Sequence, residues 1–227
     1  MKDDIIKIEG IDIVRNEKQI LSNITFKIQQ GEFVYLVGDT GSGKSSLLKA
    51  LYAEIMIKTG NIEVANTNLK LIHHKEIPVL RRKLGIVFQD FQLLTDRSVE
   101  ANLEFVLKAT GWKNKNKIKN KIAYVLDSVH LENVKDKLPF ELSGGEQQRA
   151  VIARSLLNDP EIILADEPTG NLDPNKAEKI IHLLKEINRQ GTTVLIATHN
   201  YTIIKKNISR TLKCIDKKVI EIDPKIL

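Results

Sequence analysis

The sequence has one cysteine, no long apolar run and no segment of biased composition. With Cys214 as its only cysteine the chain cannot form an internal disulfide, which suits a reducing compartment. No apolar run approaches the roughly 18 residues of a bilayer-spanning helix. The first ten residues, MKDDIIKIEG, lack the basic and apolar parts of a secretion signal. Internal repeats and Pro/Gly/Ser-rich linkers are also absent, so we expect one globular domain.

Positive charge exceeds negative charge, with a formal net charge of +6. This balance favours nucleic acid, anionic lipid or nucleotide phosphates as ligands, and alone it does not choose among them. Much of the charge lies in residues 112–121, WKNKNKIKNK, where lysines alternate without the interleaved aromatic residues of a single-strand binder. We expect a solvated face there, with contact to lipid or a partner as the alternative.

Strand-like segments open the chain, and strands alternate with a helix near its end. The strand segments combine β-branched residues with short apolar runs. The predicted strands are residues 5–14, 20–28, 32–38, 161–167 and 192–199, and the predicted helices beside them are residues 44–55 and 175–190. Buried strands followed by amphipathic helices indicate an α/β fold with a mostly parallel sheet.

The middle of the chain, residues 90–151, has a helical pattern instead. SVEANLEFVLKAT begins with Ser98, a suitable N-cap residue. The next segment carries one apolar stripe at helical spacing, formed by Ile118, Ile122, Val125, Leu126 and Val129. A further helix is predicted from Ser143 to a stop near Asn158 and Pro160. The sequence therefore predicts an inserted helical subdomain.

The stretch GDTGSGKSS matches the phosphate-loop pattern G-x-x-x-x-G-K-[ST] between a predicted strand and a predicted helix. Its glycines let successive backbone N–H groups face phosphate oxygens, Lys44 can reach the β- and γ-phosphates, and the Ser45 hydroxyl can coordinate Mg²⁺. An ordinary glycine turn is the alternative, and the strand–loop–helix context disfavours it. The predicted phosphate-binding residues are Gly38, Asp39, Thr40, Gly41, Ser42, Gly43, Lys44, Ser45 and Ser46.

An acidic pair follows the apolar strand IILADE. Asp166 and Glu167 stand at the carboxyl end of that strand, where α/β sheets place their ligands. We assign Asp166 to the metal site and Glu167 to the base that orients and polarises an attacking water. A helix cap is the alternative, which the nearby phosphate loop disfavours.

Two further polar residues close predicted strands. Gln89 ends GIVFQ and can bridge Mg²⁺ or water, which makes it a candidate for both the metal site and catalysis. His199 ends TTVLIATH and can hydrogen-bond a γ-phosphate, because its strand is predicted to run parallel to the strand that delivers Glu167. Lone Gln and His residues are otherwise structural or solvated.

A second anion-binding pattern lies about a hundred residues after the first. In LSGGEQQRA, Ser143, Gly144 and Gly145 open a predicted helix, where free N–H groups favour an anion. A single bound triphosphate does not need two anion-binding sites that lie so far apart in the sequence.

Taken in order, these motifs resemble the nucleotide-binding subunit of ATP-binding-cassette proteins over nearly the whole chain. The resemblance implies a P-loop NTPase core with an N-terminal antiparallel β part, ATP and Mg²⁺ as ligands, and ATP hydrolysis. It assigns the whole of residues 1–227 to one domain, with residues 1–89 and 152–227 as the nucleotide-binding core and about 90–151 as the helical signature subdomain.

The resemblance also explains the second anion site. In that family two subunits pack head to tail, and each signature helix caps the γ-phosphate held by the other subunit. Ser143, Gly144 and Gly145 are therefore expected to bind ATP across a homodimer interface with C₂ symmetry. Asn171, Leu172 and Asp173 resemble the loop that crosses this interface, while a helix-entry turn capped by Asp173 is a compatible reading.

The sequence departs from the family at the adenine base. The family usually stacks adenine on an aromatic residue upstream of the phosphate loop, in the region that corresponds to IDIVRNEKQ. That stretch has no aromatic residue, and Val14 and Arg15 lie nearest to the expected position. We expect weaker base selectivity, or a substitute contact through Arg15.

Residues 81–103, RRKLGIVFQDFQLLTDRSVEANL, resemble the cell-division branch of the family, especially at Asp90 and the Asp96–Arg97 pair. This branch implies a separate integral membrane partner and a peripheral position on the inner, cytoplasmic face of a bacterial membrane, with no nucleic acid involved. Lipoprotein-releasing and macrolide-exporting ATPases share several of the motifs and remain the alternative. A nucleic-acid-linked cassette ATPase is a third hypothesis.

The segment that follows Gln89 contains the candidate docking residues for such a membrane partner. Phe91, Leu93 and Leu94 are apolar and lie beside the predicted helical subdomain. They fit a docking surface, and they fit the core of the subdomain equally.

Overall fold

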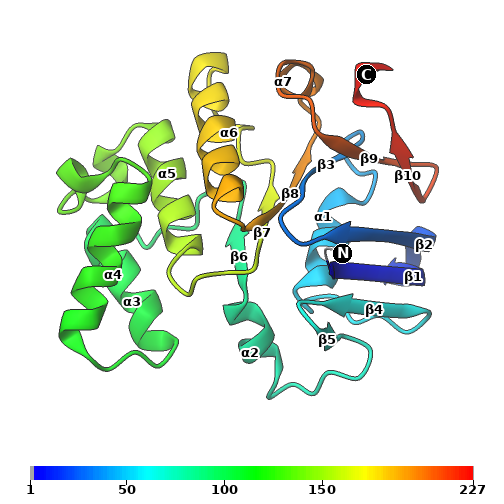
Figure 1. Cartoon of the computed structure of the whole chain (residues 1–227), viewed down its shortest axis with the longest axis horizontal. Coiled ribbons are helices and arrows are strands. Elements are labelled where there is room, and N and C mark those ends of the chain that lie inside the picture. The colour runs from blue at the N-terminus through cyan, green and yellow to red at the C-terminus, as the bar shows by residue number, and fades with distance from the viewer. Residues whose placement is uncertain (1–2, 227) are drawn as a thin grey trace.

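The computed structural model describes residues 3–226, which form two sheets with helices on either side (Figure 1). The larger sheet has the strand order β10-β9-β3-β8-β7-β6. All neighbours pair in parallel except β9 and β10, which form a hairpin, so the predicted mostly parallel sheet is confirmed. Its strands are β3 (Phe33–Val37), β6 (Leu84–Val87), β7 (Ile162–Asp166), β8 (Thr193–Thr198), β9 (Arg210–Ile215) and β10 (Lys218–Ile222).

The smaller sheet is antiparallel and contains the N-terminal strands in the order β2-β1-β4-β5. Its strands are β1 (Asp4–Arg15), β2 (Lys18–Gln29), β4 (Asn61–Val64) and β5 (Thr67–Asn68). Ile11 and Ile13 are buried and alternate with more exposed neighbours on β1, as expected for a strand with one buried face. The last two strands were not predicted, because four and two residues are too short to display a period.

Helices cover the larger sheet and form a separate lobe at one end of it (Figure 1). The helices are α1 (Lys44–Leu51), α2 (Ile77–Arg82), α3 (Val99–Ala109), α4 (Lys115–Ser128), α5 (Gly144–Ser155), α6 (Pro174–Arg189) and α7 (Tyr201–Lys206), with 3₁₀ turns at Glu132–Val134, Pro139–Glu141 and Pro224–Ile226. The lobe consists of α3, α4 and the start of α5. No helix within residues 3–226 is long and apolar enough to cross a bilayer.

Local signals in the helical lobe are confirmed. The Ser98 hydroxyl accepts the Ala101 N–H at 3.2 Å and caps α3. The apolar stripe predicted over residues 118–129 is buried along its whole length. Outside the lobe, Cys214 is 2% exposed on β9.

Two boundaries differ from the prediction. Helix α1 ends at Leu51 instead of residue 55, because Ala53 turns into the left-handed region (φ 54°) and the Glu54 N–H bonds back to the Lys49 carbonyl at 2.9 Å. Strand β6 ends at Val87, so Gln89 stands two residues beyond the strand instead of closing it.

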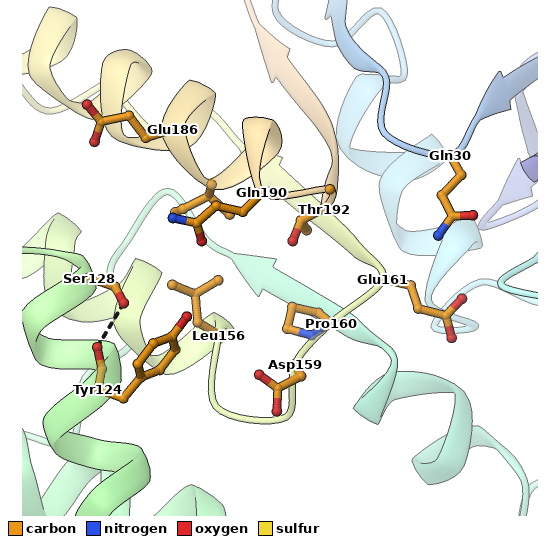
Figure 2. A pocket seen from close by; sticks show the side chains of 12 residues that line it. Gln30, Tyr124, Ser128, Leu156, Asp159, Pro160, Glu161, Glu186, Gln190 and Thr192 are labelled. Atoms are coloured by element: carbon orange, nitrogen blue, oxygen red, sulfur yellow. Dashed lines mark hydrogen bonds between the residues drawn. The ribbon is translucent and has the colours of Figure 1, made fainter. Parts of the chain in front are cut away.

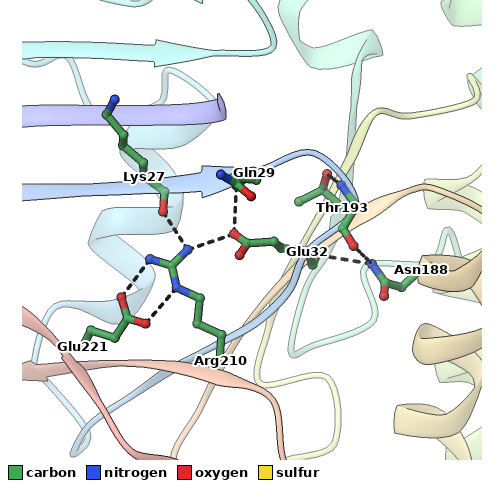
Figure 3. A network of polar contacts seen from close by, with 8 residues as sticks. Lys27, Gln29, Glu32, Asn188, Thr193, Arg210 and Glu221 are labelled. Carbon is green, nitrogen blue, oxygen red and sulfur yellow. Dashed lines mark hydrogen bonds and ion pairs between the residues drawn. The ribbon is translucent and has the colours of Figure 1, made fainter. Parts of the chain in front are cut away.

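A polar junction joins the two sheets to α6 (Figure 3). The Arg210 guanidinium donates two hydrogen bonds to Glu221, at 3.1 and 2.9 Å, and others to Glu32 and to the Lys27 carbonyl, both at 2.8 Å. Asn188 near the end of α6 donates through its amide to three backbone carbonyls. These are Gly31 at 3.1 Å, Glu32 at 3.2 Å and Thr192 at 2.8 Å.

Replacing Asn188 by alanine should lower the free energy of unfolding by about 1–3 kcal/mol, because partly buried carbonyls lose their donor. Urea denaturation would measure this change. Lys179→Ala, an exposed position on the same helix, is the control and should have little effect. Equal stability of the two variants would contradict the structural role of Asn188.

Candidate nucleotide-binding site

The predicted phosphate, metal and catalytic residues converge at one edge of the parallel sheet. Strand β8 pairs with β3 on one side and with β7 on the other, with Val37 opposite Thr198 and Asp166 opposite Ala197. Gly38, His199 and Glu167 each follow directly after one of these strand ends. The carboxyl ends of parallel strands are the usual ligand position in such folds.

The phosphate loop links β3 to α1 in the conformation that its glycines permit. Gly43 has φ 105°, and a Cβ there would lie 2.9 Å from the Leu21 side chain, so no other residue fits without strain. Lys44 is only 6% exposed, and its ammonium donates to the carbonyls of Gly38 at 2.7 Å and Asp39 at 3.0 Å. The loop thus holds a buried cation directly behind the free N–H groups of α1.

Glu167 connects this lysine to His199. Its side chain is 9% exposed, and its Oε1 lies 3.8 Å from the Lys44 ammonium and 2.7 Å from His199 Nδ1. The Glu167 backbone adopts φ 46°, the left-handed region that a residue with a side chain rarely occupies. Its N–H donates to the Ala197 carbonyl at 2.8 Å, which fixes this conformation. Strained backbone of this kind is concentrated at functional sites.

Asp166 has the surroundings of a metal ligand. Burial raises the pKa of its carboxyl, and the neighbouring Ser45 hydroxyl acts in the opposite direction. Within the described residues its Oδ1 is buried and has no hydrogen-bond partner. A buried carboxylate oxygen without a partner, close to a hydroxyl, fits Mg²⁺, which takes one or two protein ligands together with phosphate oxygens.

Gln89 faces the same space as Asp166. Both line a cavity of about 550 Å³ with Asn171 and Tyr52, and the Asn171 amide donates to the Gln89 carbonyl at 3.2 Å. Gln89 is exposed and belongs to a loop that leaves the sheet edge. The cavity therefore places Gln89 within the candidate metal site even though it lies outside the strand.

Arg154 holds the loop after Gln89, and sequence reasoning missed it. Its guanidinium donates to the carbonyls of Phe91, at 2.9 Å, and Gln92, two residues with positive φ angles of 55° and 50°. The signal was an arginine inside the apolar helical stretch VIARSLL, a position that needs buried acceptors.

The second predicted anion site, at residues 143–145, starts a capped helix and lies apart from the phosphate loop. Ser143 caps α5 in a capping box, in which its N–H and its hydroxyl donate to the Glu146 carboxylate at 2.8 and 2.6 Å. Figure 1 shows α5 and α1 on opposite sides of β6 and β7. The fold thus brings together the loop, Gln89, Asp166, Glu167 and His199, and it leaves residues 143–145 apart from them.

A further cavity of about 490 Å³ lies at the opposite edge of the sheet (Figure 2). Its wall includes Tyr124 and Ser128 of α4, Glu161 before β7 and Thr192 before β8. Glu161 and Thr192 precede their strands, whereas the phosphate loop follows one. This cavity is therefore separate from the candidate nucleotide site.

The fold and the phosphate loop define the class of protein. The family model described as ABC transporter matches residues 21–170, which include the phosphate loop, Gln89, the signature and the acidic pair. The chain therefore belongs to the ABC transporter family. With this fold and this loop it is an ATP-binding ATPase of the ABC type.

The similar proteins point to one branch of the family. The chain is 42% identical over 221 residues to the cell division ATP-binding protein FtsE of Streptococcus pneumoniae serotype 2, covering 96% of each chain. It is 45% identical over 212 residues to FtsE of Bacillus subtilis, covering 93% of this chain and 89% of that one. The dimeric post-hydrolysis structure of the cassette MJ0796 with ADP and Pi superposes with a TM-score of 0.84 at 32% identity, over 97% of this chain and 99% of that one.

Replacing Asp166 by asparagine should stabilise the nucleotide-free, metal-free protein at pH 7. Because burial raises the pKa of Asp166, the folded state binds its proton more tightly than the unfolded state, and ionisation costs stability as pH rises above the unfolded value. Melting temperatures in EDTA should therefore show a gain for Asp166→Asn at pH 7 that shrinks toward about pH 4.

Asp173 is the control, because its pKa is shifted in the opposite direction to that of Asp166. Hydrogen bonds from Lys176 lower the pKa of its carboxyl, so the carboxylate stabilises the fold above the unfolded pKa. Asp173→Ala should lower the melting temperature at pH 7, and this loss should diminish in acid. A loss of stability in Asp166→Asn at pH 7 would contradict the assignment of an uncompensated buried charge.

Proposed function

We propose that the chain is the ATPase subunit of a bacterial cell-division complex, in which it pairs with an integral membrane protein of the FtsX kind. The observation that carries the catalytic part is the contact of Glu167 with both Lys44 and His199 at the end of β7. The cell-division role rests on the names of the similar proteins. Those names favour cell division over lipoprotein release or macrolide export.

Residues of the phosphate loop bind the triphosphate in this proposal. The N–H groups from Gly38 to Ser46 face its oxygens, and the Lys44 ammonium turns from the carbonyls of Gly38 and Asp39 to the β- and γ-phosphates. The carbonyl partners hold the lysine in position beforehand, so little ordering is left for the binding step.

Glu167 is the proposed base. A water oxygen attacks the γ-phosphorus, Glu167 accepts the proton of that water, and the bond to the β–γ bridging oxygen breaks as ADP leaves. His199 holds the Glu167 carboxylate at 2.7 Å and, when protonated, can donate its second N–H to the γ-phosphate. Ser45, Gln89 and Asp166 would hold Mg²⁺, which supplies positive charge to the phosphate oxygens.

The signature residues complete the site in a homodimer. Ser143, Gly144 and Gly145 are separated from the phosphate loop of their own chain, and their helix start can accept an anion. A head-to-tail pair with C₂ symmetry brings each signature onto the ATP of the other subunit. ATP then links the two halves, and hydrolysis releases them.

Glu167→Gln tests this proposal. The variant should bind ATP, lose hydrolysis by more than a hundredfold, since a catalytic base contributes about 10²–10⁴-fold, and sediment as a dimer only with ATP and Mg²⁺. Glu186→Gln, an exposed glutamate on α6, is the matched control and should hydrolyse ATP normally. A Glu167→Gln chain that binds ATP and stays monomeric would contradict the ATP-linked dimer.

The proposed docking surface for the membrane partner is a groove between α2 and α3. This groove, of about 470 Å³, is lined by Pro78, Arg81, Val106 and Arg154, among others. Val79, next to the lining residue Pro78 in the chain, is 54% exposed, and Phe105, next to the lining residue Val106, is 50% exposed. Phe91 and Leu93 pack partly against the helical core instead.

The position of Arg154 favours this groove because the residue also holds the loop that follows Gln89. A partner in the groove would thus contact a side chain that fixes the nucleotide-sensing segment. We propose further that the chain lies peripherally on the inner, cytoplasmic face of the membrane. Residues 90–151 then form a helical unit that contributes one wall of the groove, and residues 1–89 and 152–227 form the nucleotide-binding core.

Val79→Glu should abolish co-purification with the membrane partner and leave the intrinsic ATPase rate and the melting temperature unchanged, because the side chain is exposed. Tyr124→Glu, equally exposed on α4 and outside the groove, is the control and should retain the partner. Normal partner binding by Val79→Glu would rule out this groove as the docking surface.

A further inference from the structure

Phe140 is the most exposed aromatic side chain of the described residues, at 72%. It lies on the 3₁₀ turn Pro139–Glu141, three residues before Ser143. None of the functions derived above uses it. Exposure of this extent leaves most of the ring unpacked within its own subunit.

The turn that carries Phe140 is held from both sides. The Leu138 N–H donates to the Glu141 carboxylate at 2.6 Å, and the Glu141 N–H donates to the Leu138 carbonyl at 3.0 Å. Pro139 is buried and restricts the backbone, and Leu142 anchors the other end in the helical core. The exposed ring is therefore presented from a fixed position.

The base side of the nucleotide site lacks an aromatic residue. The first half of β2 lies beside the phosphate loop, since a Cβ at Gly43 would lie 2.9 Å from the Leu21 side chain and 3.0 Å from that of Ile20. Val14 stands near the turn between β1 and β2 with 51% of its surface exposed, and residues 11–20 contain no Phe, Tyr or Trp. A base bound there would find an aliphatic surface on one side and solvent on the other.

We infer that Phe140 of one subunit covers the nucleotide base bound by the other subunit, and so replaces the missing aromatic residue. This inference rests on the proposed head-to-tail dimer. Figure 1 shows α5 and the β1–β2 pair on opposite sides of the parallel sheet. Phe140 precedes the start of α5 by four residues, so we expect it to lie out of reach of a base beside β1 and β2 of its own chain. Only a second copy brings the two surfaces together.

The spacing along the chain suits this contact. Ser143 reaches the γ-phosphate of the partner's ATP, and three residues of chain span about 10 Å at most. This reach is comparable to the length of the ribose and triphosphate that separate the base from the γ-phosphate. One nucleotide would thus touch the signature at its phosphate end and Phe140 at its base end.

The measurement is ATP-dependent dimerisation of the Glu167→Gln chain with and without Phe140→Ala. Loss of the stack should raise the ATP concentration for half dimerisation by about 5- to 100-fold per site, while ATP affinity of the monomer stays unchanged. Tryptophan in place of alanine at this position (Phe140→Trp) should restore dimerisation to the level of the Glu167→Gln chain. Tyr124→Ala, an exposed aromatic residue on α4, is the matched control and should have no effect.

A spectroscopic readout separates base stacking from a simple contact between subunits. The fluorescence of 1,N6-etheno-ATP should be quenched in the Glu167→Gln dimer, unquenched in the dimer that also carries Phe140→Ala, and quenched again with Phe140→Trp. Equal quenching with and without Phe140 would overturn the inference even if dimerisation weakens.

The head-to-tail dimer and the role of Phe140 are refuted by different results. A Glu167→Gln chain that binds ATP and never dimerises removes the head-to-tail dimer and this inference with it. A chain that dimerises normally with Phe140→Ala leaves the dimer intact and refutes the role of Phe140 alone.

Discussion

The parallel register of β3, β8 and β7 is the constraint on which the rest of the structure depends. Because these strands end at the same level, the phosphate loop, His199 and Glu167 begin at one edge of the sheet. The Glu167 N–H extends the pairing by one bond to Ala197, and this bond holds the left-handed backbone that turns the carboxylate toward Lys44. A shift of one residue between β7 and β8 would point these side chains to the other face.

At this edge of the sheet, the protein alone does not balance all of its buried charged groups. Lys44 and Glu167 are buried and 3.8 Å apart, whereas Asp166 is partly buried and one of its carboxylate oxygens has no partner among the described residues. Burying charged groups costs free energy unless other charges or hydrogen bonds offset it. In the proposed function, a triphosphate with a divalent cation would supply both the negative charge for Lys44 and the positive charge for Asp166. Binding would therefore stabilise this edge of the sheet.

The sequence predicted the α/β class, the phosphate loop and the residues at the strand ends, because these features depend on short local patterns. It failed where tertiary contacts decide the outcome. Helix α1 stops early through a bond between Glu54 and Lys49 that no helix propensity encodes. The role of Arg154 depends on carbonyls about sixty residues away in the chain, at Phe91 and Gln92. Likewise, the sequence did not predict that Phe140 is exposed, because a phenylalanine next to a proline does not indicate whether its side chain is buried.

Two hydrogen-bonded links connect parts of the molecule that would have to move together. Arg154 ties helix α5, which starts with the signature, to the loop after Gln89, and Asn171 ties Gln89 to the segment after Glu167. The groove between α2 and α3 shares Arg154 with the first link. A shift of α5 that follows closure on a second subunit's ATP would therefore change the shape of the groove. Coupling between nucleotide and partner then needs no distant signal, since one arginine belongs to the signature helix, the loop and the groove at once.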